Sequence, residues 1–426
     1  MSLGIDIVKI SRIEKALLNE KFISKILTQK EISNISQNIL HIAASFAAKE
    51  AFSKALGTGI RGFEFTDISV MHDQLGKPYF EFSDKVTSII NKKGIVKVDL
   101  SISHEKEFAV AVVTATTDKM FDNYQKVISA FEKHNEQNII NPSLIAKSIV
   151  KRQKSIHKGD CGRLFVIAGS KGMTGAAIMC SKAALKSGAG LISLGCPQSL
   201  NNVFEIATPE VMTIPLKDKD GTLDQTDLDK IIQKANASDC VVIGPGLGVT
   251  QDTCNVVYQI IKNTTKPLII DADGINAISK NIDILNHKKS KIIITPHIGE
   301  FARLTNLPSD EILGNTIKYA SEFAKKYDIT VVLKSHQTVV ADNLGNTYVN
   351  ILGNPGMATG GSGDVLSGLI ASFEAQKAEN APCTGVYIHS LAADMMATEK
   401  GEYGLTPSDI IDGIPYAIKY STNNGM

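Results

Sequence analysis

The chain has 426 residues, with 45 lysines and arginines against 44 aspartates and glutamates, and 43% of its residues are apolar. This length predicts two or three domains, the apolar fraction excludes wholesale disorder, and the near-neutral charge argues against a bulk electrostatic nucleic-acid binder. Six scattered cysteines, no apolar run of membrane-spanning length and no visible secretory signal predict a cytosolic protein with reduced thiols and no membrane association.

The first 118 residues form a self-consistent set of short strands and helices. Helical spacing of apolar residues occurs at Ser11–Leu27 and at Ile39–Leu56. The strand-like runs are Leu3–Val8, Ile68–His72, Val96–His104 and Phe108–Thr114. This mixture predicts an α+β domain over residues 1–118.

Residues 119–139 are expected to be a linker, and residues 140–426 a second domain. A basic stretch, Lys147 to Lys158, opens the second domain and is either a solvated face or a rim that attracts phosphate.

The second domain contains short, continuous apolar runs that alternate with helical patterns. These runs are Leu164–Ala168, Val241–Ile243, Leu268–Ile270, Ile292–Ile294 and Val331–Leu333. Buried strands that alternate with helices predict an α/β domain with a mostly parallel sheet. Each run is followed by glycine, aspartate, Thr-Pro or lysine, and ligands in such sheets bind beyond the carboxyl ends of the strands.

Two acidic residues of the first domain have apolar neighbours. Asp6 interrupts a strand-like run, and Glu50 lies in a helical stretch of small and apolar residues. Burying a carboxylate there is costly unless a positive charge compensates it. Either the two acids bind Mg²⁺, which takes carboxylate, phosphate and water oxygens, or they pair with Lys49, Lys54 or Arg12.

Four motifs occur in order along this domain. They are Gly4-Ile-Asp-Ile-Val8, Phe46-Ala-Ala-Lys-Glu-Ala-Phe-Ser-Lys-Ala-Leu-Gly-Thr-Gly59, Gly76-Lys-Pro78 and Ser101-Ile-Ser-His-Glu105. Together they resemble the holo-acyl-carrier-protein synthase family, the small phosphopantetheinyl transferases. The resemblance implies Mg²⁺-dependent transfer of 4′-phosphopantetheine from coenzyme A to a serine of acyl carrier protein. It also implies a trimer with its sites between subunits.

The same resemblance implies roles for individual residues. Asp6 and Glu50 would be catalytic Mg²⁺ ligands. The implied coenzyme A contacts are Lys49 (also counted as catalytic), Ser53, Lys54 and His104. Arg12 would dock the acidic recognition helix of the carrier protein, and Lys15, Lys21 and Lys25 either join it or form an ordinary exposed face.

The second domain carries several glycine-rich segments at strand ends. Gly169-Ser-Lys-Gly-Met-Thr-Gly175 and Gly244-Pro-Gly-Leu-Gly248 are the weaker ones. The segment Gly353 to Asp364 precedes an apolar helix, and its successive glycine amides would form an anion hole. Asp364 either complements the helix dipole or is a base that faces a substrate hydroxyl, and this second reading resembles the ribokinase-like fold.

Further motifs narrow the resemblance. They are His157-Lys-Gly159, Asp271-Ala-Asp-Gly-Ile-Asn276, Thr295-Pro-His-Ile-Gly-Glu300 and Asn354-Pro-Gly-Met-Ala-Thr-Gly-Gly-Ser-Gly-Asp364. They resemble the ADP- or ATP-dependent NAD(P)H-hydrate dehydratases. The resemblance implies repair of NADHX or NADPHX: the nucleotide phosphorylates the ring hydroxyl, and elimination of phosphate restores the reduced dinucleotide.

That resemblance implies that Asp364 activates the hydroxyl. The hydrate would contact Ala176, Gly246, Gly248, His297 and Asp364. The nucleotide would contact Lys334, Ser335, His336, Gln337 and Thr338, with Gly361 and Gly363 as the anion hole. Ser335 stands where the family generally has glycine, which puts the ADP or ATP preference in question. Asp271 and Asp273 either orient ligands or Mg²⁺, or cap the following helix.

Other readings remain open. The second domain is alternatively a small-molecule kinase, and the first a non-catalytic module for trimerisation or carrier-protein binding. His389, Met395 and Met396 lie in an apolar helical pattern and are predicted to be core residues.

Overall fold

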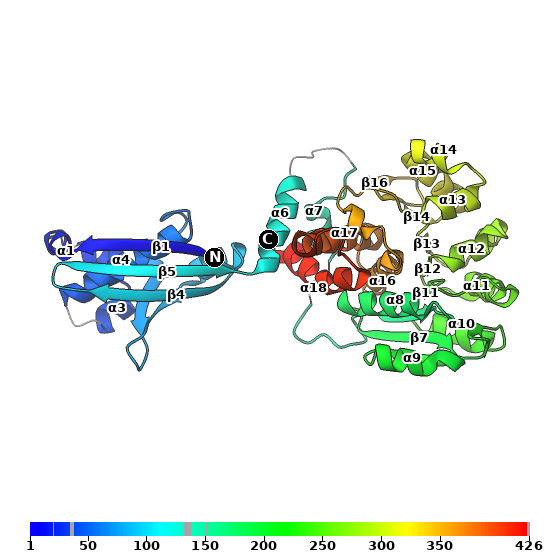
Figure 1. Cartoon of the computed structure of the whole chain (residues 1–426), viewed down its shortest axis with the longest axis horizontal. Helices are drawn as coiled ribbons and strands as arrows, with labels where there is room; N and C mark the ends of the chain where they lie inside the picture. The colour runs from blue at the N-terminus through cyan, green and yellow to red at the C-terminus, as the bar shows by residue number, and fades with distance from the viewer. Residues whose placement is uncertain (20, 35–37, 132–137, 150–151, 424–426) are drawn as a thin grey trace. The chain divides into compact units, whose positions relative to one another are not determined.

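The computed structural model describes residues 1–19, 21–34, 38–131, 138–149 and 152–423. The chain divides into two compact units, Met1–Asp122 and Asn123–Met426 (Figure 1). The boundary falls within helix α6 (Lys119–Phe131), so this part of the expected linker is helical. Residues 132–137 of that linker, and Lys151 of the basic stretch, lie outside the described residues.

The first unit contains an antiparallel sheet in the order β1-β5-β4 and a separate hairpin, β2-β3. The strands are β1 (Ser2–Lys9), β2 (Ile68–His72), β3 (Pro78–Phe82), β4 (Ile95–His104) and β5 (Phe108–Thr117). The helices are α1 (Ile10–Ala16), α2 (Lys21–Ile26), α3 (Gln29–Asn34), α4 (Ile39–Ala55), the 3₁₀ turn η1 (Phe65–Asp67) and α5 (Asp84–Lys92). This arrangement confirms the predicted α+β domain.

The prediction of one continuous helix near the start of this unit was wrong. The stretch expected to be helical over Ser11–Leu27 forms two helices, α1 and α2, with turns between them. The side chain of Asn19 accepts a hydrogen bond from the Lys21 amide at 3.1 Å, and its carbonyl accepts one from the Phe22 amide at 2.8 Å. Asparagine favours such local bonds over a continuing helix, so a new helix begins here.

Helix α4 packs directly on strand β1. A Cβ atom added to Gly4 would lie 1.9 Å from the carbonyl oxygen of Ala51, so only glycine allows this approach. Small residues on α4 make the same close packing possible and are fully buried, among them Ala47, Ala48 and Ala51. The close approach puts Asp6 of β1 beside the helix that carries Glu50.

The second unit is built on a nine-stranded sheet in the order β16-β15-β14-β13-β12-β11-β6-β7-β8 within the described residues. The strands from β14 to β8 in this order pair in parallel, while β15 and β16 are antiparallel. The bounds are β6 (Arg163–Ile167), β7 (Leu191–Pro197), β8 (Met212–Leu216), β11 (Cys240–Ile243), β12 (Leu268–Ile270), β13 (Ile292–Ile294), β14 (Thr330–Leu333), β15 (Val339–Ala341) and β16 (Thr347–Val349). A small hairpin, β9 (Asp218–Lys219) and β10 (Thr222–Leu223), lies outside this sheet.

Helices cover both faces of this sheet (Figure 1). One side carries α8 (Thr174–Lys186), α16 (Ser362–Ala375), α17 (Ala381–Lys400) and α18 (Pro407–Asn423). The other side carries α10 (Leu228–Asn236), α11 (Gln251–Asn263), α12 (Asp273–Ser279), α13 (Ile298–Thr305) and α15 (Thr316–Tyr327). The remaining elements are α7 (Pro142–Ser148), α9 (Asn201–Ala207), α14 (Ser309–Gly314) and the 3₁₀ turns η2 (Gln198–Leu200), η3 (Ile282–His287) and η4 (Pro355–Met357). The predicted α/β domain with a mostly parallel sheet is therefore confirmed.

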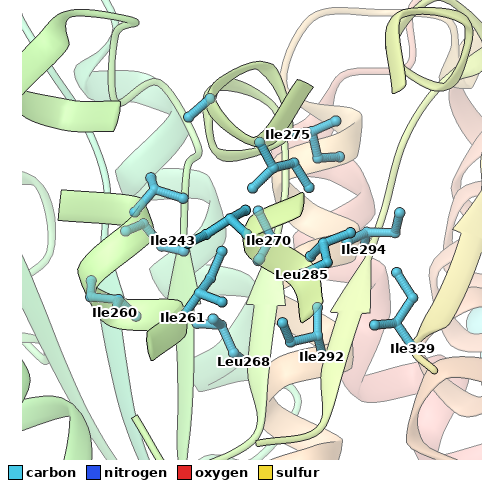
Figure 2. Close-up of a cluster of buried hydrophobic side chains, with 14 of the residues drawn as sticks. Ile243, Ile260, Ile261, Leu268, Ile270, Ile275, Leu285, Ile292, Ile294 and Ile329 are labelled. Carbon is cyan, nitrogen blue, oxygen red and sulfur yellow. The ribbon is translucent and has the colours of Figure 1, made fainter. Parts of the chain in front are cut away.

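The core of this unit consists largely of branched aliphatic residues. Figure 2 shows strand residues such as Ile243, Ile270 and Ile294 together with Ile261 of α11 and Ile275 of α12. These side chains are essentially inaccessible to solvent. Burial of apolar surface contributes about 25 cal/mol per Å², so this cluster stabilises the sheet that positions the site.

Met395 and Met396 are buried, as predicted, and so is His389. All six cysteines lie within the described residues, and each is a buried free thiol. None of the helices in the described part of the chain combines the length and apolar character that a membrane crossing requires.

Candidate active sites

A charged cluster lies where the parallel strands of the second unit end. Lys334 follows β14, and its Nζ lies 3.0 Å from Oδ1 of Asp271, which follows β12. A Cβ atom added to Gly363 would lie 3.1 Å from the same Nζ. The ammonium group therefore lies between two strand ends and the first turn of α16. Burial alone lowers the pKa of Lys334, but the carboxylates of Asp271 and Glu300 outweigh it and raise that pKa, so the lysine stays charged.

The N-terminus of α16 faces this lysine as an open helix end. Its N-cap, Gly361, has φ of +99°, a left-handed conformation that favours glycine. Among the described residues no side chain caps this helix end. Free amides and the positive end of the helix dipole favour an anion here.

Asp364, in the first turn of α16, has an environment suited to a base. Burial and the negative charge of Asp271 raise the pKa of its carboxyl group to about 7, against the opposing charge of Lys334. A group that titrates near neutrality accepts a proton in a reaction and loses it again afterwards with little cost. A first-turn acid that only complemented the helix dipole would have a lowered pKa, because the positive end of the dipole stabilises a carboxylate. The raised pKa of Asp364 therefore favours the role of a base.

The residues expected to contact the hydrate come from neighbouring loops. Ser170 donates a hydrogen bond to the carbonyl of Gly246 at 2.9 Å, and a Cβ atom added to Gly246 would lie 2.9 Å from Cβ of Ala176. The amide of Gly248 donates to Asp273 at 2.9 Å. The loops that follow β6 and β11 are thus packed together at the carboxyl edge of the sheet.

His297, the N-cap of α13, is fixed in one tautomer. Its Nδ1 accepts hydrogen bonds from the amides of Gly299 at 3.0 Å and Glu300 at 3.3 Å, which places the ring proton on Nε2. Burial, then the charges of Lys334 and Arg303, lower the pKa of the ring. An isolated β-bridge pairs the backbones of His297 and Lys334, so the histidine lies beside the charged cluster. Neutral His297 thus has an N–H donor at Nε2, which lies 3.5 Å from Oε1 of Glu300 on a side chain that is 55% exposed.

The two aspartates after β12 have different partners. Asp271 is 1% exposed and pairs with Lys334. Asp273 accepts hydrogen bonds from the Gly248 amide and from Nδ2 of Asn276, the latter at 3.2 Å. Both aspartates therefore have protein partners that position the lysine and the glycine loop.

The remaining predicted nucleotide residues lie in the hairpin between β14 and β15. Ser335 donates to the carbonyl of Gln337 at 2.7 Å, so its hydroxyl closes the hairpin on itself. His336 and Gln337 are exposed, and the carbonyl of Thr338 accepts from the Asn350 amide at 2.9 Å. The side chain at position 335 thus rigidifies this turn.

The site of the first unit brings two carboxylates close to each other and to two basic side chains. Lys54 Nζ lies 2.7 Å from Oδ1 of Asp6. Burial, then the charge of Asp6, raise the pKa of Glu50, while Lys54 and Arg12 lower it. The structure thus brings Asp6, Glu50, Lys54 and Arg12 together. Repelling carboxylates at a half-buried position are oxygen donors that fit Mg²⁺, which commonly takes one or two carboxylates and completes its shell with phosphate and water.

Two predicted coenzyme contacts were wrong. Lys49 is 0% exposed, and its Nζ donates to Glu31 at 2.6 Å and to the carbonyls of Ile26 and Phe65. Ser53 is 2% exposed and donates to the carbonyl of Glu50 at 2.8 Å. Both side chains are directed into the core, so neither faces a coenzyme phosphate or serves as a catalytic group.

His104 is exposed, and its ring centroid lies 6.4 Å from that of His41. Lys15, Lys21 and Lys25 are exposed as well. Among the described residues no group of three or more histidine, cysteine, aspartate or glutamate side chains forms a metal site, so Asp6 and Glu50 would need substrate or water oxygens to complete one.

Sequence reasoning missed several residues. Glu31 was not singled out, although it is the buried partner of Lys49. Glu300 ends the motif Thr295-Pro-His-Ile-Gly-Glu300, and the spacing His297-x-x-Glu300 is a capping-box pattern. Asp394 is an acid within an apolar helix, as Glu50 is.

The fold and the site together define a ribokinase-like domain. Residues 164–416 match the NAD(P)H-hydrate dehydratase family, and the chain belongs to this family. Residues 2–113 match the 4′-phosphopantetheinyl transferase superfamily. Both resemblances predicted from the motifs are confirmed.

Individual relatives agree with the dehydratase match of the second unit. The ADP-dependent (S)-NAD(P)H-hydrate dehydratase of Listeria monocytogenes is 33% identical over 66% of this chain and 96% of that protein. The crystal structure of the ADP/ATP-dependent NAD(P)H-hydrate dehydratase from Bacillus subtilis, co-crystallized with ATP/Mg²⁺, matches with a TM-score of 0.57 and 27% identity, over 66% of this chain and 98% of that one.

The bifunctional NAD(P)H-hydrate repair enzyme of Thermofilum pendens is 37% identical over 63% of this chain. The match covers only 52% of that protein, so the chain spans about half the length of such bifunctional relatives.

Proposed function

We propose that the chain is a bifunctional enzyme, and that its second unit converts NADHX and NADPHX to NADH and NADPH with ADP or ATP. The observation that carries the proposal is Asp364, a carboxyl group with a pKa of about 7 at an open helix end beside Lys334. Membership of the dehydratase family supports the choice of reaction over other reactions that the same geometry would serve.

The proposed chemistry assigns each group one task. Asp364 takes the proton of the ring hydroxyl, and the hydroxyl oxygen attacks the terminal phosphoryl group of the nucleotide. The bond from that phosphorus to the bridging oxygen breaks, and AMP leaves from ADP, or ADP from ATP. The amides around Gly361 and Gly363, together with the Lys334 ammonium, stabilise the charge of the transferring phosphoryl group. The carbon–oxygen bond then breaks and its electron pair leaves with phosphate, while the neighbouring ring carbon gives a proton to the departing phosphate or to water and forms the double bond. The Nε2–H group of His297 donates to the bound hydrate.

The test incubates the purified protein with NADHX, Mg²⁺ and either ADP or ATP, and follows the return of NADH absorbance. Recovery of NADH with release of phosphate supports the proposal. Failure with both nucleotides refutes it, and a stable phosphorylated product would assign the site to a small-molecule kinase instead.

We propose that the first unit transfers 4′-phosphopantetheine from coenzyme A to acyl carrier protein. The superfamily match supports this assignment, and so do Asp6 and Glu50, whose carboxylates fit Mg²⁺. Mg²⁺ would neutralise the coenzyme pyrophosphate and stabilise the departing phosphate. Lys54 and His104 would hold coenzyme phosphates, and exposed Arg12, beside Glu50, would contact the acidic carrier protein.

The first unit is also proposed to self-associate, with a trimer as the expected state. Leu3, Ile5 and Ile7 are 57%, 50% and 61% exposed and point from one face of β1. Exposed neighbouring apolar side chains on a strand favour a partner surface over water. Sedimentation of Ile5→Lys/Ile7→Lys should show a smaller particle than the wild type, and an unchanged particle would refute this surface.

Asp6→Ala and Glu50→Ala separate catalysis from a purely structural role of this unit. Each variant should lose pantetheine transfer to acyl carrier protein and keep the wild-type particle size. Retained transfer in both would assign the unit to trimerisation or carrier-protein binding only.

A further inference from the structure

A buried polar contact lies directly beneath the proposed phosphate site. Ser362 is the first residue of α16, and His389 lies on α17; they are 7% and 5% exposed. Oγ of Ser362 lies 3.3 Å from Nε2 of His389. The sequence predicted that His389 is buried. It did not predict that the ring contacts the first turn of α16, the helix that carries Asp364.

The position of Ser362 makes the direction of its hydroxyl important. A serine hydroxyl readily hydrogen-bonds nearby backbone groups, and the amides of Gly363 and Asp364 lie in the same turn as Ser362. At α16 no described side chain caps the amides, and the one hydroxyl available in the first turn is directed to His389. An anion that approaches this helix end therefore meets no competing hydroxyl.

The contact is a hydrogen bond between neutral groups. Burial, then the charge of Lys334, lower the pKa of His389 to about 4, so its imidazole is uncharged at neutral pH. A neutral ring does not attract phosphate by its charge, and it does not stabilise the Asp364 carboxylate. Its contribution is to fix the direction of the hydroxyl.

Helix α17 also holds the loop that leads into α16. Asp394 accepts hydrogen bonds from the Gly353 amide at 2.9 Å and from Nδ2 of Asn354 at 2.7 Å. Ser390 contacts Nδ2 of Asn350 at 3.0 Å. His389 is thus the member of this polar row that reaches the helix end itself.

We propose that His389 is a positioning residue for nucleotide binding: it holds the Ser362 hydroxyl away from the first-turn amides of α16 and leaves them free for phosphate. This inference rests on the proposed dehydratase function, since it needs a phosphate at this helix end.

The test is a double-mutant cycle on the full-length protein. Binding of ATP with Mg²⁺ is measured by calorimetry without hydrate, for the wild type, His389→Leu, Ser362→Ala and the double variant. His389→Leu should bind about tenfold more weakly, because its released hydroxyl competes for the amides. The double variant should bind within about threefold of Ser362→Ala, since no hydroxyl remains to be held. Met395→Leu, on the same helix, controls for changes in core packing.

A double variant as weak as His389→Leu would overturn the inference, because His389 would then act only through packing. If His389→Leu does not fold, His389→Met takes its place in the same cycle. Wild-type protein that binds neither ATP nor ADP would instead refute the proposed function. Wild-type binding combined with independent, additive effects refutes only the role of His389.

Discussion

Replacing Asp364 by asparagine should lower activity by several orders of magnitude and at the same time stabilise the fold. The folded pKa of about 7 exceeds the ordinary value of 3.8, so the folded protein disfavours the charged carboxylate. The stabilisation linked to the neutral form is fully present below the unfolded pKa and is lost as the pH rises through 7. Because one pKa unit corresponds to about 1.4 kcal/mol, the loss reaches on the order of 4 kcal/mol above pH 8.

Asparagine stays uncharged at every pH and escapes this loss. Asp364→Asn should therefore be more stable than the wild type by about 2 kcal/mol at pH 5 and about 4 kcal/mol at pH 8.5, with a 10²–10⁴-fold lower kcat. Calorimetric unfolding of the full chain at both pH values measures the difference. The unfolding transition of the second unit is identified as the one that moves to higher temperature when nucleotide is added. Asp220→Asn, an exposed carboxyl group, is the matched control. An equal gain in the free energy of unfolding at both pH values would refute the reasoning.

Three further outcomes are expected. Lys334→Gln should weaken nucleotide binding and move the rise of activity with pH to higher pH, because Lys334 lowers the pKa of Asp364; an unmoved pH profile would contradict this. Lys49→Met should destabilise the first unit by about 3–5 kcal/mol in thermal unfolding, because Glu31 would remain as an unpaired buried charge, and Lys49→Met/Glu31→Gln should recover part of the loss. Glu50→Gln should reduce pantetheine transfer at least 10²-fold without changing NADH recovery, and parallel loss of both activities would argue against separate sites.

The sheet of the second unit was largely readable from the sequence. Its central strands are short apolar runs buried on both faces, such as Val241–Ile243 and Ile292–Ile294, and such runs have few other interpretations. The polar residues placed after them also follow from topology, because parallel strands end at the same edge. Lys334 and Asp271 meet there although 63 residues separate them.

Lys49 shows where this reasoning fails. In an amphipathic helix, periodicity separates the buried face from the exposed face, but α4 is buried on nearly every side, so the pattern does not say where Lys49 points. Its partner, Glu31, lies 18 residues earlier on a helix that the sequence did not indicate. A buried ion pair between distant elements leaves no local signal, whereas a role for the adjacent Glu50 could be proposed from a motif.

The proposed site of the second unit contains more carboxylates than ammonium groups, and this excess favours a nucleotide that carries a bound cation. In the second unit the carboxylates of Asp271, Glu300 and Asp364 surround one lysine, and burial with mutual repulsion raises the pKa values of Glu300 and Asp364. A bare polyphosphate entering this cluster would add further negative charge at short range in a partly buried site, where Coulomb repulsion is poorly screened. A nucleotide with Mg²⁺ carries less negative charge, and the open end of α16 offsets part of the remainder. The same reasoning makes the fully paired Lys49 and Glu31 unsuited to a ligand, since their charges are already compensated.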